Sequence, residues 1–328
     1  MISVYSVTDG RLVIGEESAL AQTGGQPLWI DLHDPSAAGI AVVEGMIGLR
    51  LPSRDTQREI EASKRLSRHG DALVMTLPVL TGATSFEPRN SAVTFILRGS
   101  LLVTVRHDAP KAITNYIDDL RQNPEPPGSG GDVFLGLMEA VVERIADVVQ
   151  GVEDELDFVS HRIFHQHTPD NRRRRAGSRE LEAQLRTIGR NGDLAAKARE
   201  TLLGMKRMVA FLPKGDLGPG GAEGRIRLEV IERDAHSLAE HIDFMANKTN
   251  FLLDATLGVI GIQQNQIIKL FTIMSVLFLP PTLVASWYGM NFKVIPELQW
   301  DYGYLYAIAL AVLTALVPYV VFKRKGWF

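Results

Sequence analysis

The sequence predicts an α+β membrane protein with an N-terminal α/β domain, a long stalk helix and two C-terminal transmembrane helices. Short β-branched runs alternate with helical patterns over residues 1–122. A helical pattern then continues from Glu223 into an apolar run. Residues 270–292 and 302–322 contain no charged side chain, and each run is long enough to cross a hydrocarbon core of roughly 30 Å as a helix.

The N-terminal α/β domain is predicted from its periodicity and its turn signals. Strands are expected over residues 28–32, 72–80, 92–97 and 101–106, and helices over residues 36–50 and 52–67. The pair Asp34-Pro35 ends the first strand, and Gly99 lies in the tight hairpin between the last two. Asp31, Asp55 and Asp71 are interpreted as cap or turn residues rather than metal ligands.

The composition excludes several kinds of site. The 328 residues include no cysteine, which excludes disulfides, thiolate metal sites and cysteine nucleophiles. The net charge of −3 indicates no nucleic-acid partner, and the basic run at residues 172–175 is interpreted as a solvated turn because no aromatic residues are interleaved with it. The sequence shows no phosphate loop, nucleophile elbow or HExxH motif, so we predict that the protein is not an enzyme. No signal peptide is expected.

The middle of the chain is predicted to be helical. Residues 123–131, rich in proline and glycine, form a linker, and residues 132–222 form a helical region with long helices over 132–166 and 178–212. The stalk helix is expected over residues 223–290, with its transmembrane part at about 267–290. Its pattern is unbroken up to Pro280-Pro281, and a helix of about 65 residues would be about 100 Å long.

The C-terminal hairpin has an unequal charge distribution at its ends. The loop over residues 291–301 contains one lysine and two acids, whereas the tail after the second span, residues 323–328, begins Lys323-Arg324-Lys325. By the positive-inside rule the C-terminus is cytoplasmic. Because the number of spans is even, we expect the N-terminus to be cytoplasmic too.

One face of the stalk helix carries a stripe of small and polar residues at alternating spacings of four and three. A stripe with this period stays on one side of a helix that packs against copies of itself. Two explanations remain open: the stripe lines a pore, or its small residues only let helices pack closely. The stripe consists of Asp254, Gly258, Gly261, Asn265, Ile268, Thr272, Ser275, Leu279 and Thr282.

The loop between the spans resembles that of the CorA family of divalent-cation (magnesium and cobalt) transporters. The run Tyr288-Gly289-Met290-Asn291-Phe292 matches the family signature between two C-terminal spans, and the order of domains is similar over the whole chain. Trp29-Ile30-Asp31-Leu32 and residues 102–105 are weaker matches. The resemblance implies a funnel-shaped homopentamer in the inner membrane, with the stalk helices lining a pore.

The resemblance also implies roles for particular residues. Gly289, Met290 and Asn291 would form the selectivity filter, in which a ring of Asn291 oxygens binds hydrated Mg²⁺. Asn265 would form a second polar ring, and the apolar constrictions would be Ile268, Phe271 and Leu279. Thr272, Ser275 and Thr282 would line the pore between these rings, and Asp254 would supply carboxylates at its cytoplasmic mouth.

The sequence departs from the family pattern in two places. Lys293 replaces the acid that commonly follows the filter, which weakens the expected recruitment of cations. Val230 occupies the position of a magnesium-sensing acid. The candidate regulatory acids are therefore Glu229, Glu232 and Asp234, and Mg²⁺ is expected to be both transported and regulatory.

Two alternatives remain. A proton-coupled zinc transporter of the ZntB branch would use imidazole ligands, for which the candidates are His161, His165, His167, His236 and His241. Met290, which that branch tends to replace, is intact, so Mg²⁺ is favoured, with Co²⁺ as a further permeant ion. The other alternative, a membrane-anchored adaptor, gives no reason for polar residues in register along the first span.

Overall fold

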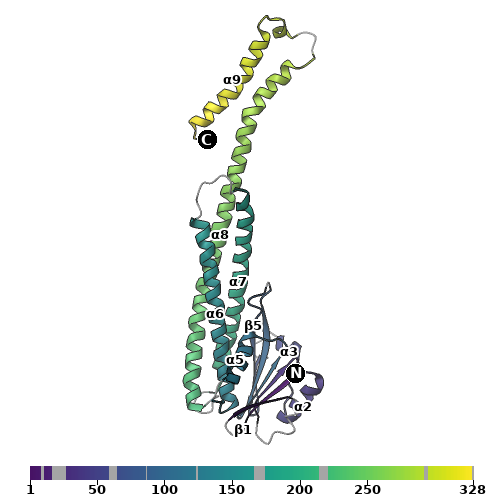
Figure 1. The fold of residues 1–328 in the computed structure, drawn as a ribbon, viewed down its shortest axis with the longest axis vertical. Helices are drawn as coiled ribbons and strands as arrows, with labels where there is room; N and C mark the ends of the chain where they lie inside the picture. Colours follow the sequence, from purple (N-terminus) through teal and green to yellow (C-terminus); the bar gives the residue numbers. More distant parts are fainter. Residues whose placement is uncertain are drawn as a thin grey trace. The chain divides into compact units, whose positions relative to one another are not determined.

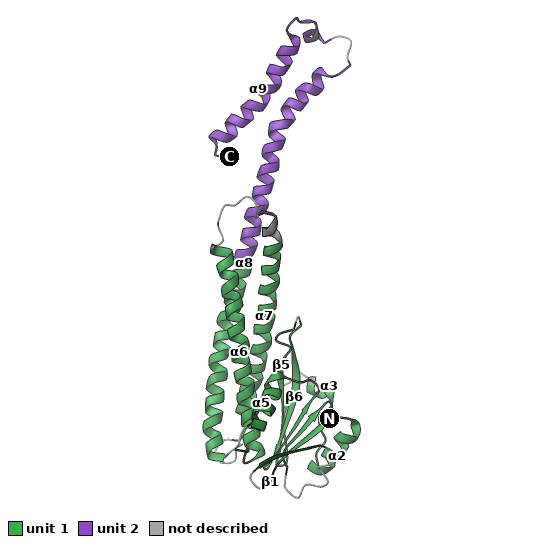
Figure 2. Cartoon of the chain, in the orientation of Figure 1, with its two compact units in different colours: residues 1–254 green, residues 255–328 purple. Residues whose placement is uncertain are grey.

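The computed structural model describes residues 1–8, 11–16, 27–58, 65–85, 87–122, 125–165, 174–213, 221–291 and 295–326. The chain divides into two compact units, which Figure 2 shows in different colours: unit 1 is Met1–Asp254 and unit 2 is Ala255–Phe328. The boundary falls inside one helix, α8 (Gly221–Tyr288). Residues 125–131, part of the expected linker, lie within unit 1.

Unit 1 contains a mixed sheet, which has seven strands in the part of the chain that is described. Its order is β2-β1-β3-β7-β6-β5-β4, and β3 and β7 are its parallel pair. The four expected strands are confirmed as β3, β5, β6 and β7. The strand bounds are β1 Ile2–Thr8, β2 Arg11–Glu16, β3 Pro27–His33, β4 Leu66–His69, β5 Ala72–Thr81, β6 Arg89–Arg98 and β7 Leu101–Arg106.

Helices cover both faces of this sheet (Figure 1). On one face, α2 (Ala37–Ile47) buries Val43 and Ile47 against Ile30 and Val103. Ser36 caps this helix, since its hydroxyl accepts the backbone N–H of Gly39 at 3.2 Å. The expected helix over residues 36–50 is therefore confirmed.

The second expected helix, over residues 52–67, is only partly correct. Helix α3 spans Arg54–Arg58, and residues 59–64 lie outside the described part of the chain. Leu66–His69 is not helical but forms β4, an edge strand that pairs with β5. Pairing with a neighbouring strand has overridden the local helical preference of this segment.

The other face of the sheet is covered by α5 (Lys111–Gln122), α6 (Gly130–His165) and α7 (Arg174–Phe211). Phe95 of β6 meets Phe134 of α6 edge to face, with ring centroids 5.7 Å apart. Trp29 of β3 lies 6.2 Å from the ring of Tyr116 in α5. These aromatic contacts fix the start of the long helices on the sheet.

The long helices of unit 1 pack along apolar seams. Ile231, Ala235, Ile242 and Met245 of α8 are almost completely buried, at spacings of four, seven and three residues along one side of the helix. Three ion pairs also join α8 to α6, and we call this set the charge ladder. It consists of Arg227–Glu139 at 2.6 Å, His241–Glu153 at 3.3 Å and Lys248–Asp157 at 2.5 Å.

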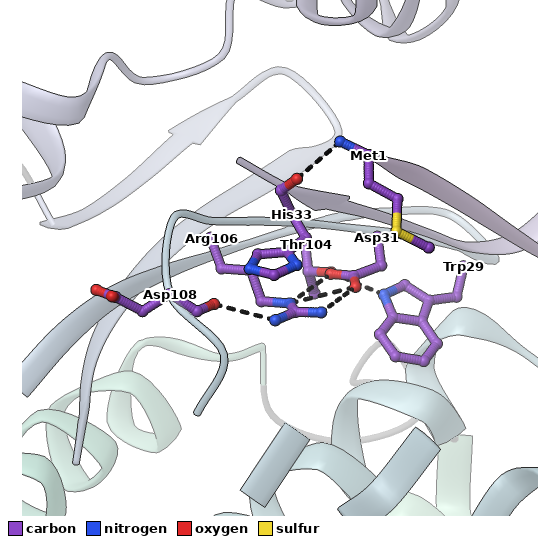
Figure 3. A network of polar contacts seen from close by, with 7 residues as sticks. All are labelled: Met1, Trp29, Asp31, His33, Thr104, Arg106 and Asp108. Atoms are coloured by element: carbon purple, nitrogen blue, oxygen red, sulfur yellow. Dashed lines mark hydrogen bonds and ion pairs between the residues drawn. The ribbon is translucent and has the colours of Figure 1, made fainter. Parts of the chain in front are cut away.

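Asp31 is neither a cap nor a turn residue, contrary to expectation. It lies within β3, 2% exposed, and its carboxylate accepts hydrogen bonds from Arg106 at 2.8 Å and from Thr104 at 2.7 Å (Figure 3). The Arg106 guanidinium also donates to the Asp108 carbonyl at 3.0 Å. Because β3 and β7 are parallel neighbours, Asp31 and Thr104 lie directly opposite each other. A buried charge that is paired and hydrogen-bonded in this way holds the centre of the sheet together.

Unit 2 contains the end of α8, a short 3₁₀ helix η1 (Pro296–Gln299) and α9 (Gly303–Arg324). Helix α8 continues through Pro280-Pro281 as far as Tyr288, eight residues beyond the point to which the pattern is unbroken. Each of these prolines lacks a backbone N–H, so the helix crosses them with two hydrogen bonds fewer.

Candidate functional site

The two expected spans lie in exposed helices. In the most apolar window of α8 only 6% of the residues are buried, and in that of α9 none are. A core helix of a soluble protein would be mostly buried, and a signal sequence would lie near the N-terminus. The apolar surface of unit 2 therefore has to be covered by lipid or by other copies of the chain.

The turn after α8 presents the predicted filter. The Gly289 N–H donates to the Ala285 carbonyl at 3.0 Å, and the Met290 N–H reaches that of Trp287 at 3.4 Å. Asn291 follows directly, outside the helix and exposed. A Cβ at Gly289 would lie 3.0 Å from the Ala285 carbonyl oxygen. Glycine therefore allows the backbone to turn close to the last turn of α8.

The other side of the loop is also built on a close backbone approach. The Gly303 N–H donates to the Trp300 carbonyl at 3.0 Å, and a Cβ at Gly303 would overlap the Glu297 carbonyl. Sequence reasoning missed this glycine, although its place at the start of the second span marks it as a turn residue. Residues 292–294, which include Lys293, lie outside the described part of the chain.

The stripe lies on exposed α8 surface in the part that belongs to unit 2. Ser275, Leu279 and Thr282 line one open depression of about 430 Å³, together with Phe278, Leu283 and Ser286. Ser286 continues the same period, four residues after Thr282, and sequence reasoning missed it. Asn265, Ile268 and Phe271 are exposed on the same helix.

The hydroxyl groups of the stripe are oriented by the helix itself. Thr272 donates its proton to the Ile268 carbonyl at 2.8 Å, and Thr282 donates to that of Phe278 at 2.7 Å. A hydroxyl that gives its proton to the helix keeps two acceptor lone pairs. These oxygens can therefore accept hydrogen bonds from the water shell of a cation.

Residues 24–324 match the family model described as "CorA-like Mg2+ transporter protein". The chain belongs to the CorA family. It is also 34% identical over 331 residues to the magnesium transport protein CorA of Escherichia coli K12, with 100% of both chains covered.

Solved structures support the fold. The CorA magnesium transporter of Methanocaldococcus jannaschii matches with a TM-score of 0.74 at 18% identity, covering 100% of this chain and 99% of that one. The ZntB cytoplasmic domain of Vibrio parahaemolyticus matches with a TM-score of 0.51 at 10% identity, covering 78% and 96%. Both CorA and ZntB structures thus share this fold, which by itself does not distinguish magnesium from zinc.

The candidate regulatory acids of this CorA family member are exposed on α8, on both sides of its buried seam. Glu229, Glu232 and Asp234 are exposed on α8, beside Ile231 and Ala235, which are buried. Asp234 lies 4.0 Å from Arg233, which is a loose contact between exposed groups. Asp254, the last residue of unit 1, is also exposed on α8.

The histidines of the zinc alternative are partly engaged elsewhere. His241 lies 3.3 Å from Glu153 in the charge ladder, and His236 lies 3.6 Å from Glu240. His167 and the side chain of His165 lie outside the described residues. Within the described residues, no group of three or more His, Asp or Glu side chains is arranged to hold a metal ion.

Proposed function

We propose that the protein transports Mg²⁺ across the inner membrane through a homopentameric pore. The single observation that carries this proposal is the position of Asn291. It is exposed directly after the turn between the two membrane-length helices of a CorA family chain.

The chemistry of the filter suits magnesium. Mg²⁺ loses its water shell reluctantly, so selection works best by hydrogen bonding to the hydrated ion. A ring of five Asn291 side chains offers neutral carbonyl acceptors for these waters, and Asn265 offers a second ring. The Thr272 and Thr282 oxygens, whose protons are held by the helix, add further acceptors in the same span.

Assembly around an axis follows from the exposed polar stripe. Burying an unpaired hydroxyl or amide in lipid is costly, and symmetric packing of α8 removes the stripe from the hydrocarbon. The apolar side chains Ile268, Phe271 and Leu279 then meet their copies and form constrictions that gate by dewetting. Met290, which is 40% exposed, lies beside Asn291 at the mouth.

The cytoplasmic part of the protein supplies regulation in this proposal. Asp254 places five carboxylates at the inner mouth, and Glu229, Glu232 and Asp234 bind internal Mg²⁺ at the exposed face of α8. Co²⁺, which shares the charge and hydration of Mg²⁺, is transported by the same route.

The main test measures Mg²⁺ uptake in proteoliposomes with an entrapped magnesium indicator. Asn291→Ala removes hydrogen bonds to a charged, hydrated ion worth about 1.5–3 kcal/mol each, so uptake should fall roughly tenfold or more. The control is Asn115→Ala, which removes an exposed asparagine from α5 and should leave uptake unchanged. Equal uptake by both variants would remove the basis of the proposal.

Two further measurements test ion choice and orientation. Competition between Mg²⁺ and Zn²⁺, with and without a pH gradient, should show Mg²⁺ preference and no proton requirement; zinc preference coupled to protons would support the ZntB alternative. Because the chain contains no cysteine, Gln299→Cys and Lys325→Cys can each be labelled with an impermeant maleimide. Only the first should react from outside the cell.

The regulatory role is tested by closure of the pore at high internal Mg²⁺. Asp254→Ala should shift the concentration at which uptake stops, whereas Asp119→Ala, an exposed acid of α5, should not. An unchanged closure curve for Asp254→Ala would make this residue structural.

A further inference from the structure

Aromatic residues with a polar edge gather around the loop of unit 2. Of the four tryptophans and seven tyrosines in the chain, two and four respectively fall within residues 287–306. They are Trp287, Tyr288, Trp300, Tyr302, Tyr304 and Tyr306, and we call this set the aromatic belt. All of them flank the turn that presents Asn291.

Contacts within unit 2 account for little of this set. Trp300 and Tyr306 meet edge to face with ring centroids 5.8 Å apart, which ties the loop to the first turns of α9. Trp287, Tyr302 and Tyr304 nevertheless remain 63%, 76% and 80% exposed. Aromatic side chains of this size are seldom left uncovered in such numbers.

The opposite ends of the same spans carry basic residues. Lys323 follows Tyr302 by 21 residues along α9, a rise of about 31 Å, and Lys269 precedes Trp287 by 18 residues along α8, about 27 Å. Both distances are close to the thickness of a hydrocarbon core, about 30 Å. The Lys323 ammonium lies 6.0 Å from the centroid of the Tyr319 ring, one turn earlier in α9.

We propose that the aromatic belt binds the ester and headgroup layer of the outer leaflet and holds the filter loop at that depth. Lipid is the occupant that the chemistry favours, because tryptophan N–H and tyrosine O–H groups donate to ester carbonyl and phosphate oxygens while their rings stay among the upper acyl chains. The proposal rests on the proposed function in that the hairpin spans a membrane. The new element is that these side chains determine how deep the mouth of the pore lies in the membrane.

The absence of cysteine allows a direct depth measurement. A nitroxide label at Leu305→Cys, an exposed α9 residue beside the belt but not part of it, reports depth through its relative accessibility to oxygen and to a water-soluble nickel chelate. Leu313→Cys, about 12 Å deeper along α9, is the hydrocarbon reference, and Asn115→Cys is the aqueous one. Full-length protein in phosphatidylcholine vesicles is used throughout.

The expected result is an intermediate accessibility ratio at Leu305, between those of the two references. Replacing Trp300, Tyr302 and Tyr304 together by serine should shift the Leu305 label toward one reference, while the label at Leu313 stays accessible to oxygen. The proposal would be overturned if the Leu305 label had the accessibility ratio of the Leu313 label or that of the Asn115 label. It would also be overturned if a second copy shielded the Leu305 label from both reagents. An unchanged ratio after the triple replacement would overturn it too.

Mg²⁺ uptake by the same vesicles separates the two proposals. If the Leu305 label lies at interfacial depth but protein with an unaltered filter shows no Mg²⁺ uptake, transport is refuted and the anchor proposal stands. Normal uptake with a Leu305 label outside the interface would refute the anchor alone.

Discussion

Unit 1 has a core in which large apolar side chains such as Trp29 and Phe95 are completely buried, whereas in unit 2 Phe271 and Leu279 are 65% and 67% exposed. Polar groups show the reverse arrangement. Asp31 and Arg106 are buried and fully paired in unit 1, while the hydroxyls of unit 2 lie on an open surface. Unit 1 therefore supplies its own core, and unit 2 is completed by surroundings that the single chain does not contain.

Glycines add a narrower comparison, between one glycine in tight contact and two on the stripe; Gly151 and Gly189, in helices of unit 1, also have open space around a Cβ. In unit 1, Gly136 is required because a Cβ would overlap the Tyr116 ring. In unit 2, Gly258 and Gly261 have nothing within 4 Å of such a Cβ, although each lies inside α8. A glycine in a helix interior costs about 1 kcal/mol relative to alanine. Nothing within the chain offsets that cost, which is the pattern expected if close packing against copies does.

The strongest way to break unit 1 is to remove one side of its buried ion pair. Arg106→Ala leaves the Asp31 carboxylate buried and unpaired, which should cost about 3–5 kcal/mol of unfolding free energy. Arg121→Ala is the matched control, since its partner Asp118 is exposed and the pair should contribute below about 1 kcal/mol. Denaturant titration of the full chain in detergent, followed by circular dichroism, measures both. Similar losses for the two variants would contradict a core held by this pair.

Alanine in place of Gly136 should affect stability, whereas alanine in place of Gly258 should affect assembly. Gly136→Ala should destabilise unit 1 by about 1–3 kcal/mol through overpacking against Tyr116. Gly258→Ala should leave the thermal midpoint of unit 1 unchanged but reduce the pentamer fraction, as measured by native mass spectrometry. Full assembly of the Gly258→Ala protein would show that these glycines are not packing sites.

The smallest expected effect is a pH dependence of unit 1. Burial, followed by the positive charge of Arg106, lowers the pKa of His33 from 6.5. The unfolded chain therefore binds a proton near pH 6.5 that the folded chain does not, so stability is present above that pH and is lost as the pH falls below it. The thermal midpoint should drop between pH 7.5 and pH 5.5, and His33→Gln should drop less. Equal drops would exclude this histidine as the cause.

Much of the fold could be predicted because its signals are local. The long helices and the hairpin follow from spacings of three and four and from uncharged runs. The buried role of Asp31 could not be predicted, since its partner Arg106 lies 75 residues away and no nearby pattern indicates the pairing. Strands β1 and β2 were not predicted, and β4 formed where a helix was expected, because pairing with neighbouring strands decides the structure of these segments. The filter roles remain predictions, since a ring of five side chains exists only in an assembly.

The charge ladder has a consequence for the potential along α8. The basic partners of the ladder, Arg227, His241 and Lys248, all belong to α8, and the acidic partners all belong to α6. A helix that lines a route for divalent ions would repel them if its own positive charges were unbalanced. The acids of α6 offset the charges of Arg227 and Lys248, whereas Arg225 and Arg233 stay exposed on α8 near the carboxylates of Glu229 and Glu232. The ladder therefore fastens α8 to α6 and offsets part of the positive charge of α8 at the same time.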